Sequence, residues 1–284
     1  MLFLILTSLL WAASFGLIKR HLVGLDPTFV AWCRLVLALV VFAPFLRPRV
    51  IRGKAAVQLI ALGTVQYGVM YLLYIQSYQY LAGHEVALFT ALTPLHVVLL
   101  DGLLERHLKA RSVAAGLIAV GGAVVLAWGE VGSSVLVGFG LVQAANFCFA
   151  VGQVSYRRIA RNREWKHSQV FAWLYLGAVL LATAVGLSGD AFSSLEVTRT
   201  QLSVLLYLGV IASGLGFFLW NVGATQTSAP RLAVMNNLKA PLAAAVALLV
   251  FGESADPVRL GLSSVLLAAA LLLSGPQRTG KEQT

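Results

Sequence analysis

Long apolar runs recur along the whole chain, and their length constrains the fold more than any other feature. Of the 284 residues only 11% are charged, and the mean hydropathy is +0.83. A run of about 18 or more mostly apolar residues is long enough to cross the hydrocarbon core of a bilayer as a helix. The runs do not alternate between apolar and polar residues, as the strands of a membrane β-barrel do. The sequence therefore predicts an all-α integral membrane protein.

Ten such runs are predicted to be transmembrane helices. Their expected bounds are 2–18, 28–46, 55–81, 84–103, 113–129, 135–156, 168–187, 202–222, 232–251 and 258–274. No basic segment precedes the first run, so we interpret it as a membrane span and not as a signal peptide. Cys33 and Cys148 both fall within spans, where a disulfide framework is not expected.

The basic residues predict how the chain is oriented. The net charge of +10 comes from short clusters between the spans, and loops rich in Lys and Arg stay in the cytoplasm. With the amino terminus inside, fifteen basic residues fall in inside loops and four in outside loops, while Arg34 and Lys239 lie within spans. This pattern predicts a multi-pass protein of the inner (plasma) membrane with both termini in the cytoplasm. It does not indicate binding of nucleic acid.

The two halves of the chain resemble each other. A shift of 146 residues places "LGTVQYGVMYLLY", which begins at Leu62, on "LGVIASGLGFFLW", which begins at Leu208. Five helices per half is an odd number, so the second half must enter the membrane inverted. Inverted repeats recur in secondary transporters, which bind substrate near the midplane between the repeats. We expect repeats over residues 1–129 and 135–275 around a central cavity, followed by a cytoplasmic tail over 276–284.

Four segments resemble the drug/metabolite transporter superfamily, specifically its ten-helix exporters with two EamA repeats. They are "LLWAASFGLIKR" in the first span, "FVAWCRL" in the second, "ALTPLHVVLLDGLLERH" in the fourth and "NNLKAPLAAAVALLVFGES" in the ninth. Within the superfamily the chain looks most like the YddG-type exporters of aromatic and other amino acids. The resemblance implies a plasma-membrane carrier, surrounded by lipid, that works by alternating access. No cofactor and no metal are expected, and a monomer is compatible with the pattern.

Aromatic residues form one wall of the predicted cavity. At 100° per residue, Tyr67, Tyr71 and Tyr74 share a face of the third span. The 146-residue shift places Tyr71 on Phe217 and Tyr74 on Trp220 of the eighth span. Buried phenol hydroxyls need hydrogen-bond partners, which lipid tails do not offer. Either helix packing or contact with an organic solute explains this face.

Polar residues at midplane depth complete the predicted site. Lys239 lies near the centre of the ninth span, where an uncompensated lysine costs about 2.5 to 3.5 kcal/mol on insertion scales. We expect it to attract a solute carboxylate. The same shift places Thr90 and Thr93 on Asn236 and Lys239.

Two prolines and three titratable residues are further candidates. Pro94 and Pro241 follow the polar pairs and predict kinks, which are either hinges for alternating access or static bends. His96 is one turn beyond Thr93 and titrates near neutral pH when unperturbed. Arg34 and Glu85 lie toward the outer ends of their spans, where either a structural ion pair or an outer gate is expected.

Other functions fit the sequence less well. Carboxylates are confined to loops and helix ends, which disfavours export of cationic drugs by proton exchange. Sugar-phosphate and nucleotide-sugar translocators usually need several buried cations, whereas Lys239 is the central one here. "DGLLER" lacks the downstream aspartates that a lipid phosphotransferase requires, so the chain is not expected to be an enzyme. The sequence favours export of small metabolites, most of all amino acids.

Overall fold

A computed structural model describes residues 2–104, 110–127, 132–160, 165–193, 196–225, 242–254 and 256–274, which form helices and connections without a strand. The helical elements are α1 (Leu2–His21), α2 (Pro27–Phe42), η1 (Ala43–Phe45), α3 (Lys54–Gly63), η2 (Thr64–Val69), α4 (Met70–Ser77), α5 (Gly83–Thr90), α6 (Thr93–Leu104), α7 (Ala110–Ala127), α8 (Gly132–Ala160), α9 (His167–Ser188), α10 (Arg199–Leu206), η3 (Tyr207–Leu215), α11 (Gly216–Thr225) and α13 (Pro257–Ser274). Residues 242–249 are also helical.

Helix length and apolar surface confirm the all-α membrane fold. Within the described residues, six helical segments are long and apolar enough to cross a bilayer: Leu2–His21, Pro27–Phe45, Lys54–Ser77, Ser133–Tyr156, His167–Ser188 and Arg199–Gly223. A shorter apolar helix covers Pro257–Ala270. Large apolar side chains point outward from the bundle, with Leu117 70% and Leu249 85% exposed. Apolar surface of this extent is expected to contact lipid.

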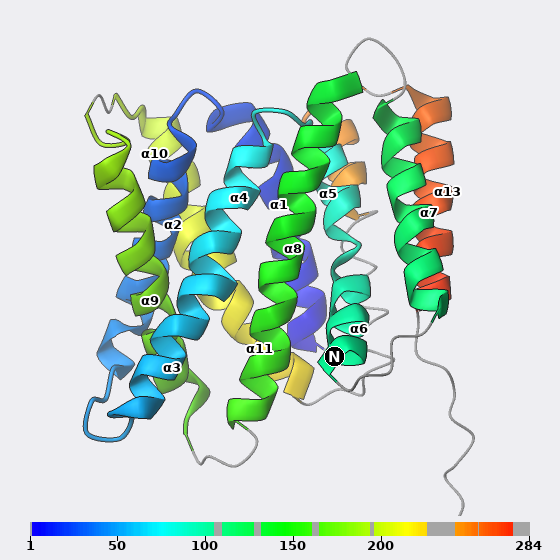
Figure 1. Cartoon of the computed structure of the whole chain (residues 1–284). Coiled ribbons are helices and arrows are strands. Elements are labelled where there is room, and N and C mark those ends of the chain that lie inside the picture. The colour runs from blue at the N-terminus through cyan, green and yellow to red at the C-terminus, as the bar shows by residue number, and fades with distance from the viewer. Residues whose placement is uncertain are drawn as a thin grey trace, which may run out of the picture.

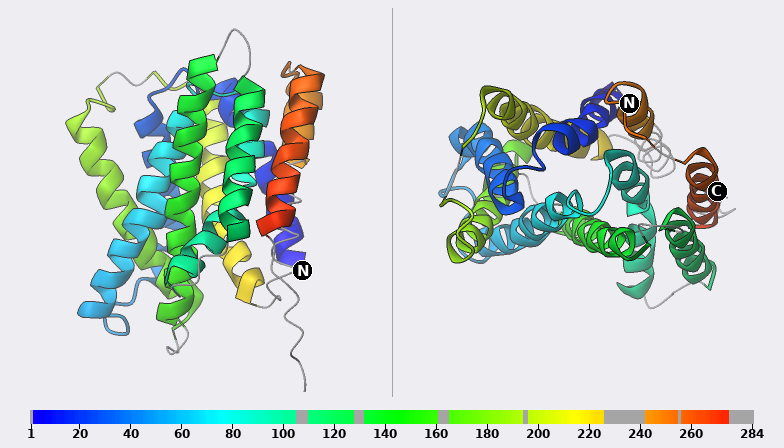
Figure 2. Two further views of the ribbon diagram at one scale, coloured as in Figure 1. Left: turned by 45° about the vertical axis from the view of Figure 1, so that its right-hand side comes forward. Right: turned by 90° about the horizontal axis from the view of Figure 1, so that it is seen from above.

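The helices surround a centre, and the two halves run in opposite directions. Helix α1 begins at the end of the bundle marked N, whereas α8, the first helix of the second half, begins at the opposite end (Figure 1). Seen from above, α1, α4, α5 and α8 lie around the middle, α9 packs against α2 and α3 at one edge, and α7 packs against α13 at another (Figure 2).

The fourth predicted span is interrupted just before Pro94. Proline has no N–H for the carbonyl four residues earlier, and its ring clashes with that carbonyl. Here the carbonyl belongs to Thr90, and it accepts a hydrogen bond of 2.7 Å from the Thr93 hydroxyl instead. Helix α5 therefore ends at Thr90 and α6 begins at Thr93. The sequence predicts a single helix with a kink, whereas the structure has two helices meeting at Ala91 and Leu92.

The third and eighth predicted spans each contain a π-helical segment, η2 and η3, at positions that the 146-residue shift superimposes. A π-helical turn widens the helix and releases carbonyls from the usual i→i−4 pattern. In η3 the N–H of Gly216 bonds to Ile211, five residues back, and the carbonyl of Ala212 accepts from the Trp11 indole at 2.8 Å. These segments turn backbone polar groups toward neighbouring helices, where side chains bind them.

Candidate functional site

A cavity of about 80 Å³ lies between the helices of both halves. The described residues that line the cavity are Trp11, Ser14, Phe15, Arg34, Met70, Tyr71, Tyr74, Thr90, Thr93, Ala145, Asn146, Phe149 and Phe217. Five residues that the sequence predicts for the site, Tyr71, Tyr74, Thr90, Thr93 and Phe217, are among them.

Arg34 supplies the charge of the cavity. Its side chain is 3% exposed, its Nε donates to the Ser213 hydroxyl at 3.2 Å, and its Nη2 donates to the Tyr71 hydroxyl at 3.2 Å. The guanidinium carbon also lies 4.6 Å from the centre of the Tyr71 ring. Nη1 is buried and has no hydrogen-bond partner. Within the described part of the chain, the buried cation thus keeps one nitrogen for a ligand.

The proposed pairing of Arg34 with Glu85 is wrong. A carboxylate oxygen of Glu85 accepts from the backbone N–H of Ala82 at 2.7 Å and closes the first turn of α5. Arg34 instead turns inward to Tyr71 and Ser213. Ser213 belongs to η3, so this π-helical segment supplies one of the two hydroxyl partners of Arg34. No carboxylate in the described residues lies within ion-pair distance of Arg34.

Aromatic rings form the apolar part of the lining. Trp11 lies 4.8 Å from Phe217 between ring centres, Phe149 lies 5.5 Å from Phe217, and Phe15 meets Tyr74 edge to face at 6.3 Å. Such pairs offer ring faces and edges to an organic solute and fix one another in place.

Tyr67 and Trp220 support this wall from behind and do not line the cavity. Tyr67 stacks on Tyr175 at 5.0 Å, and Trp220 packs on Trp11 at 5.3 Å. Both are almost fully buried. The expectation for Tyr67 assumed 100° per residue, but Tyr67 lies within η2, and the wider π-helical turns change its direction relative to Tyr71.

His96 is also outside the lining, and its Nδ1 lies 3.1 Å from the carbonyl of Leu92. That carbonyl lies at the break between α5 and α6, so the imidazole contacts a backbone group and not the cavity. Asn236, Lys239 and Pro241 lie outside the described residues, and their roles stay predictions, as do the hinge roles of both prolines.

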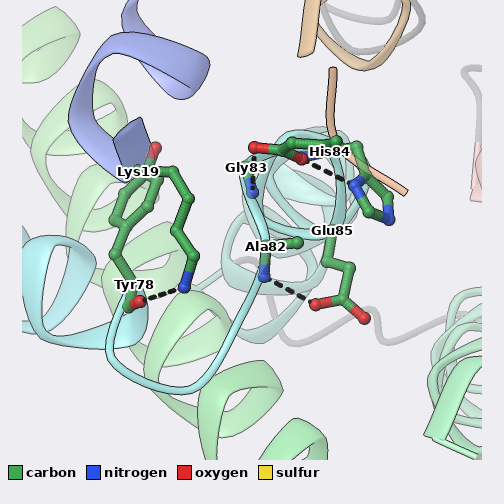
Figure 3. A network of polar contacts seen from close by, with 7 residues as sticks. Lys19, Tyr78, Ala82, Gly83, His84 and Glu85 are labelled. Atoms are coloured by element: carbon green, nitrogen blue, oxygen red, sulfur yellow. Dashed lines mark hydrogen bonds and ion pairs between the residues drawn. The ribbon is translucent and has the colours of Figure 1, made fainter. Parts of the chain in front are cut away.

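A second polar cluster joins the two halves where α5 begins, at the end of the bundle opposite the amino terminus (Figure 1), and Figure 3 shows it from close by. The Glu253 carboxylate accepts from the N–H groups of Gly83 and His84, at 3.0 and 2.9 Å, and from His84 Nδ1 at 2.7 Å. Nearby, Lys19 donates to the carbonyl of Tyr78 at 2.9 Å. We call the contact of Glu253 with Gly83 and His84 the outer clamp. It fixes the amino terminus of α5 to the segment after residues 242–249.

The outer clamp predicts a stability that depends on pH. Burial raises the pKa of the Glu253 carboxyl, but the hydrogen bonds from the His84 ring and from the His84 and Gly83 amides outweigh burial, so the net shift of its pKa is downward. A lowered pKa means that the ionised form stabilises the fold above the ordinary value of 4.5, and that this contribution is lost as the pH falls through the native value. We expect Glu253→Gln to lower the unfolding free energy at pH 7 by about 1 to 3 kcal/mol.

The measurement is thermal unfolding in detergent from pH 3 to pH 8. The difference between wild type and Glu253→Gln should shrink below pH 4.5. Glu196→Gln, at an exposed carboxylate, is the matched control and should follow the wild type throughout. A difference that stays constant across the whole range would show that the charge of Glu253 is irrelevant.

Comparison with known proteins identifies the family. A family model described as EamA-like transporter family matches residues 1–128 and 136–275. The chain belongs to the EamA-like transporter family. It is therefore a multi-pass membrane transporter of a small-molecule solute and not an enzyme, as the sequence predicts.

Several EamA-like relatives carry substrate names. The chain is 41% identical over 256 residues to the "Biotin transporter" of Salmonella typhimurium, covering 89% of this chain and 85% of the relative. It is 38% identical to the "Probable biotin transporter" of Pseudomonas aeruginosa, covering 95% and 96%. It is 24% identical to the "Probable terminal-alkyne amino-acid exporter" of Streptantibioticus cattleyicolor, covering 95% and 92%. A solved structure titled "Crystal structure of protein" shares the fold, with a TM-score of 0.68, 20% identity and 96% of each chain covered.

Several lining residues of this EamA-like transporter are not marked as such by the sequence patterns. Trp11 and Phe15 share a face of the first span, and Asn146 shares a face of the sixth with Gln143, but helix packing explains such stripes equally well. Pro94, which interrupts the fourth span, was the usable signal for Asn146, whose amide donates to the Phe89 carbonyl beside the break. No sequence signal marks the π-helical segment whose Ala212 carbonyl accepts from Trp11.

Proposed function

We propose that the chain is a secondary transporter for biotin, or for a carboxylic acid of the same charge and similar shape. The observation that carries the proposal is the unpaired Nη1 of Arg34, a buried cation at the cavity wall. An ionisable side chain inside a membrane protein is by default a functional group. The names of two relatives that share about two fifths of their sequence with this chain support the same substrate.

Charge favours a monoanion over an amino acid. The described lining residues include one cation, Arg34, and no carboxylate. A monoanion such as biotin neutralises Arg34, whereas a zwitterionic amino acid brings no net charge and places its ammonium in a cavity without an anionic partner. Desolvating an unpaired charge costs several kcal/mol even after relaxation. Export of amino acids, aromatic ones included, is therefore the competing proposal, supported by the sequence resemblance and by one distant relative.

The rest of the lining suits a ring-bearing acid. Biotin has a carboxylate at one end of an alkyl chain and a bicyclic ring with neutral N–H groups at the other. The rings of Trp11, Phe149 and Phe217 offer apolar contact for the chain and the ring system. Phosphorylated sugars and nucleotide sugars carry two or more negative charges, which usually call for more than one buried cation.

Alternating access between the two inverted halves is the mechanism that we propose. The outer clamp then has to open when the cavity faces the outside, because it joins the first half to the second. We place both termini in the cytoplasm and the protein in the inner membrane. This orientation agrees with the exposed basic residues of the α2–α3 connection, Arg47, Arg49 and Arg52, which lie at the same end as the amino terminus (Figure 1).

Uptake of labelled biotin into liposomes that contain the purified protein tests the proposal. We expect saturable uptake that unlabelled biotin inhibits, while phenylalanine, tryptophan and glucose 6-phosphate do not inhibit it. Empty liposomes are the background control. No saturable uptake of labelled biotin, together with saturable uptake of labelled phenylalanine or tryptophan, would favour the competing proposal instead.

A further inference from the structure

Three residues with side-chain oxygens line the cavity beside the break between α5 and α6: Thr90, Thr93 and Asn146. We call the Oγ1 atoms of the two threonines and the Oδ1 atom of Asn146 the acceptor surface. Thr93 is 1% exposed and Asn146 is 5% exposed, and all three residues line the cavity. What they can bind depends on which of their hydrogens are already donated.

The two threonine hydroxyls have no hydrogen left for a ligand. The hydroxyl of Thr90 donates to the carbonyl of Val86 at 2.7 Å. The hydroxyl of Thr93 lies 2.7 Å from the carbonyl of Thr90 and 3.1 Å from Asn146 Oδ1, and both of these atoms are acceptors. A hydroxyl has one donor hydrogen and two lone pairs, so both threonines present lone pairs to the cavity.

Asn146 is oriented by its neighbours in the same way. Its Nδ2 donates to the carbonyl of Phe89 at 3.0 Å and to Gln143 Oε1 at 3.2 Å. Rotating the amide by half a turn would set its oxygen against the Phe89 carbonyl oxygen. The neighbouring acceptors therefore determine which terminal atom of Asn146 is the nitrogen and which is the oxygen. Both amide hydrogens are used, and the remaining capacity of Asn146 is a lone pair on Oδ1.

We propose that the acceptor surface selects solutes that carry neutral N–H donors on the end remote from the carboxylate. This inference rests on the proposed function, since it assigns the part of the same site that contacts the end of the solute remote from the carboxylate. Arg34 can only donate, and the acceptor surface can only accept, so the cavity has opposite hydrogen-bonding character at its two polar places. A cyclic urea or amide satisfies the acceptor surface. A solute ring without N–H groups covers the buried oxygens of the acceptor surface without donating to them, and such unsatisfied acceptors lower the binding affinity.

Binding of biotin and of lipoate by the purified protein tests the inference. Both acids carry a pentanoate chain, but the dithiolane ring of lipoate has no N–H. We expect wild type to bind biotin at least about 30-fold more tightly than lipoate. Thr90→Val and Thr93→Val should each weaken biotin binding about three- to tenfold, which corresponds to one hydrogen bond. Neither should change lipoate binding, and Thr93→Ser should restore biotin binding.

Thr7→Val is the matched control, because Thr7 is fully buried, donates to backbone carbonyls and does not line the cavity. It should leave both affinities unchanged. Equal wild-type affinities for biotin and lipoate, or threonine variants that weaken both acids equally, would overturn the inference while the proposed function stands. If wild type binds neither acid, the proposed function fails and the inference fails with it.

Discussion

Arg34→Ala should reduce biotin uptake at least about 30-fold while leaving the empty protein as stable as wild type. Removing one partner of a buried charge pair commonly costs about 2 to 5 kcal/mol of binding free energy, and each 1.4 kcal/mol is a factor of about ten in affinity. Without substrate the Arg34 charge has no anionic partner in the described structure. Replacing an uncompensated buried charge is not destabilising in itself. The measurement is uptake combined with the thermal midpoint, with and without biotin.

Arg34→Lys separates charge from geometry. Lysine keeps the positive charge but has no planar fork to bond Ser213 and Tyr71 while holding a carboxylate. We expect intermediate uptake, about tenfold below wild type, and a smaller rise of the thermal midpoint with biotin. Arg47→Ala, at an exposed loop position, is the control. If Arg34→Ala destabilised the empty protein but kept its affinity for biotin, Arg34 would be a structural residue.

The second large effect concerns the contact of α3 with α9. Gly63 lies against the backbone of Leu174, and Gly177 lies against the backbone of Ile60, so that a Cβ on either glycine would overlap a carbonyl group. Backbone atoms cannot move aside as the end of a flexible side chain can. We expect Gly63→Ala to force the two helices apart and to lower the unfolding free energy by about 1 to 3 kcal/mol or more. The thermal midpoint and the yield of monodisperse protein in detergent measure this.

Gly261→Ala is the matched control, because nothing lies within 4 Å of a Cβ at that position in α13. Alanine is favoured over glycine in a helix by up to about 1 kcal/mol, so this variant should be as stable as wild type or slightly more stable. If Gly63→Ala had the same thermal midpoint and yield as Gly261→Ala, the close backbone contact of α3 with α9 would be contradicted.

Hydrophobic length and the internal repeat were enough to predict the membrane fold. Tyr71 and Phe217, which the 146-residue shift aligns, both line the cavity. Thr90 and Thr93 line it as well, since their depth follows from the span that contains them. Position along a span was therefore predictable from the sequence.

Direction around a helix was less predictable. A regular 100° rotation places Tyr67 with Tyr71, but η2 changes the rotation between them, and Tyr67 packs on Tyr175 instead. The depth of Arg34 alone predicts an ion pair with Glu85, structural or part of an outer gate. Its actual partners, Tyr71 and the Ser213 hydroxyl, are brought together by two other helices, and no pattern within the second span specifies them.

The most direct test of the carboxylate site is a thermodynamic cycle. Dissociation constants are measured for biotin and for its uncharged methyl ester, each on wild type and on Arg34→Ala. If Arg34 binds the carboxylate, esterification and Arg34→Ala should each weaken binding at least about 30-fold, and the two changes together should weaken it no further. Independent effects that multiply, or an ester that binds wild type as tightly as the acid, would contradict the assignment.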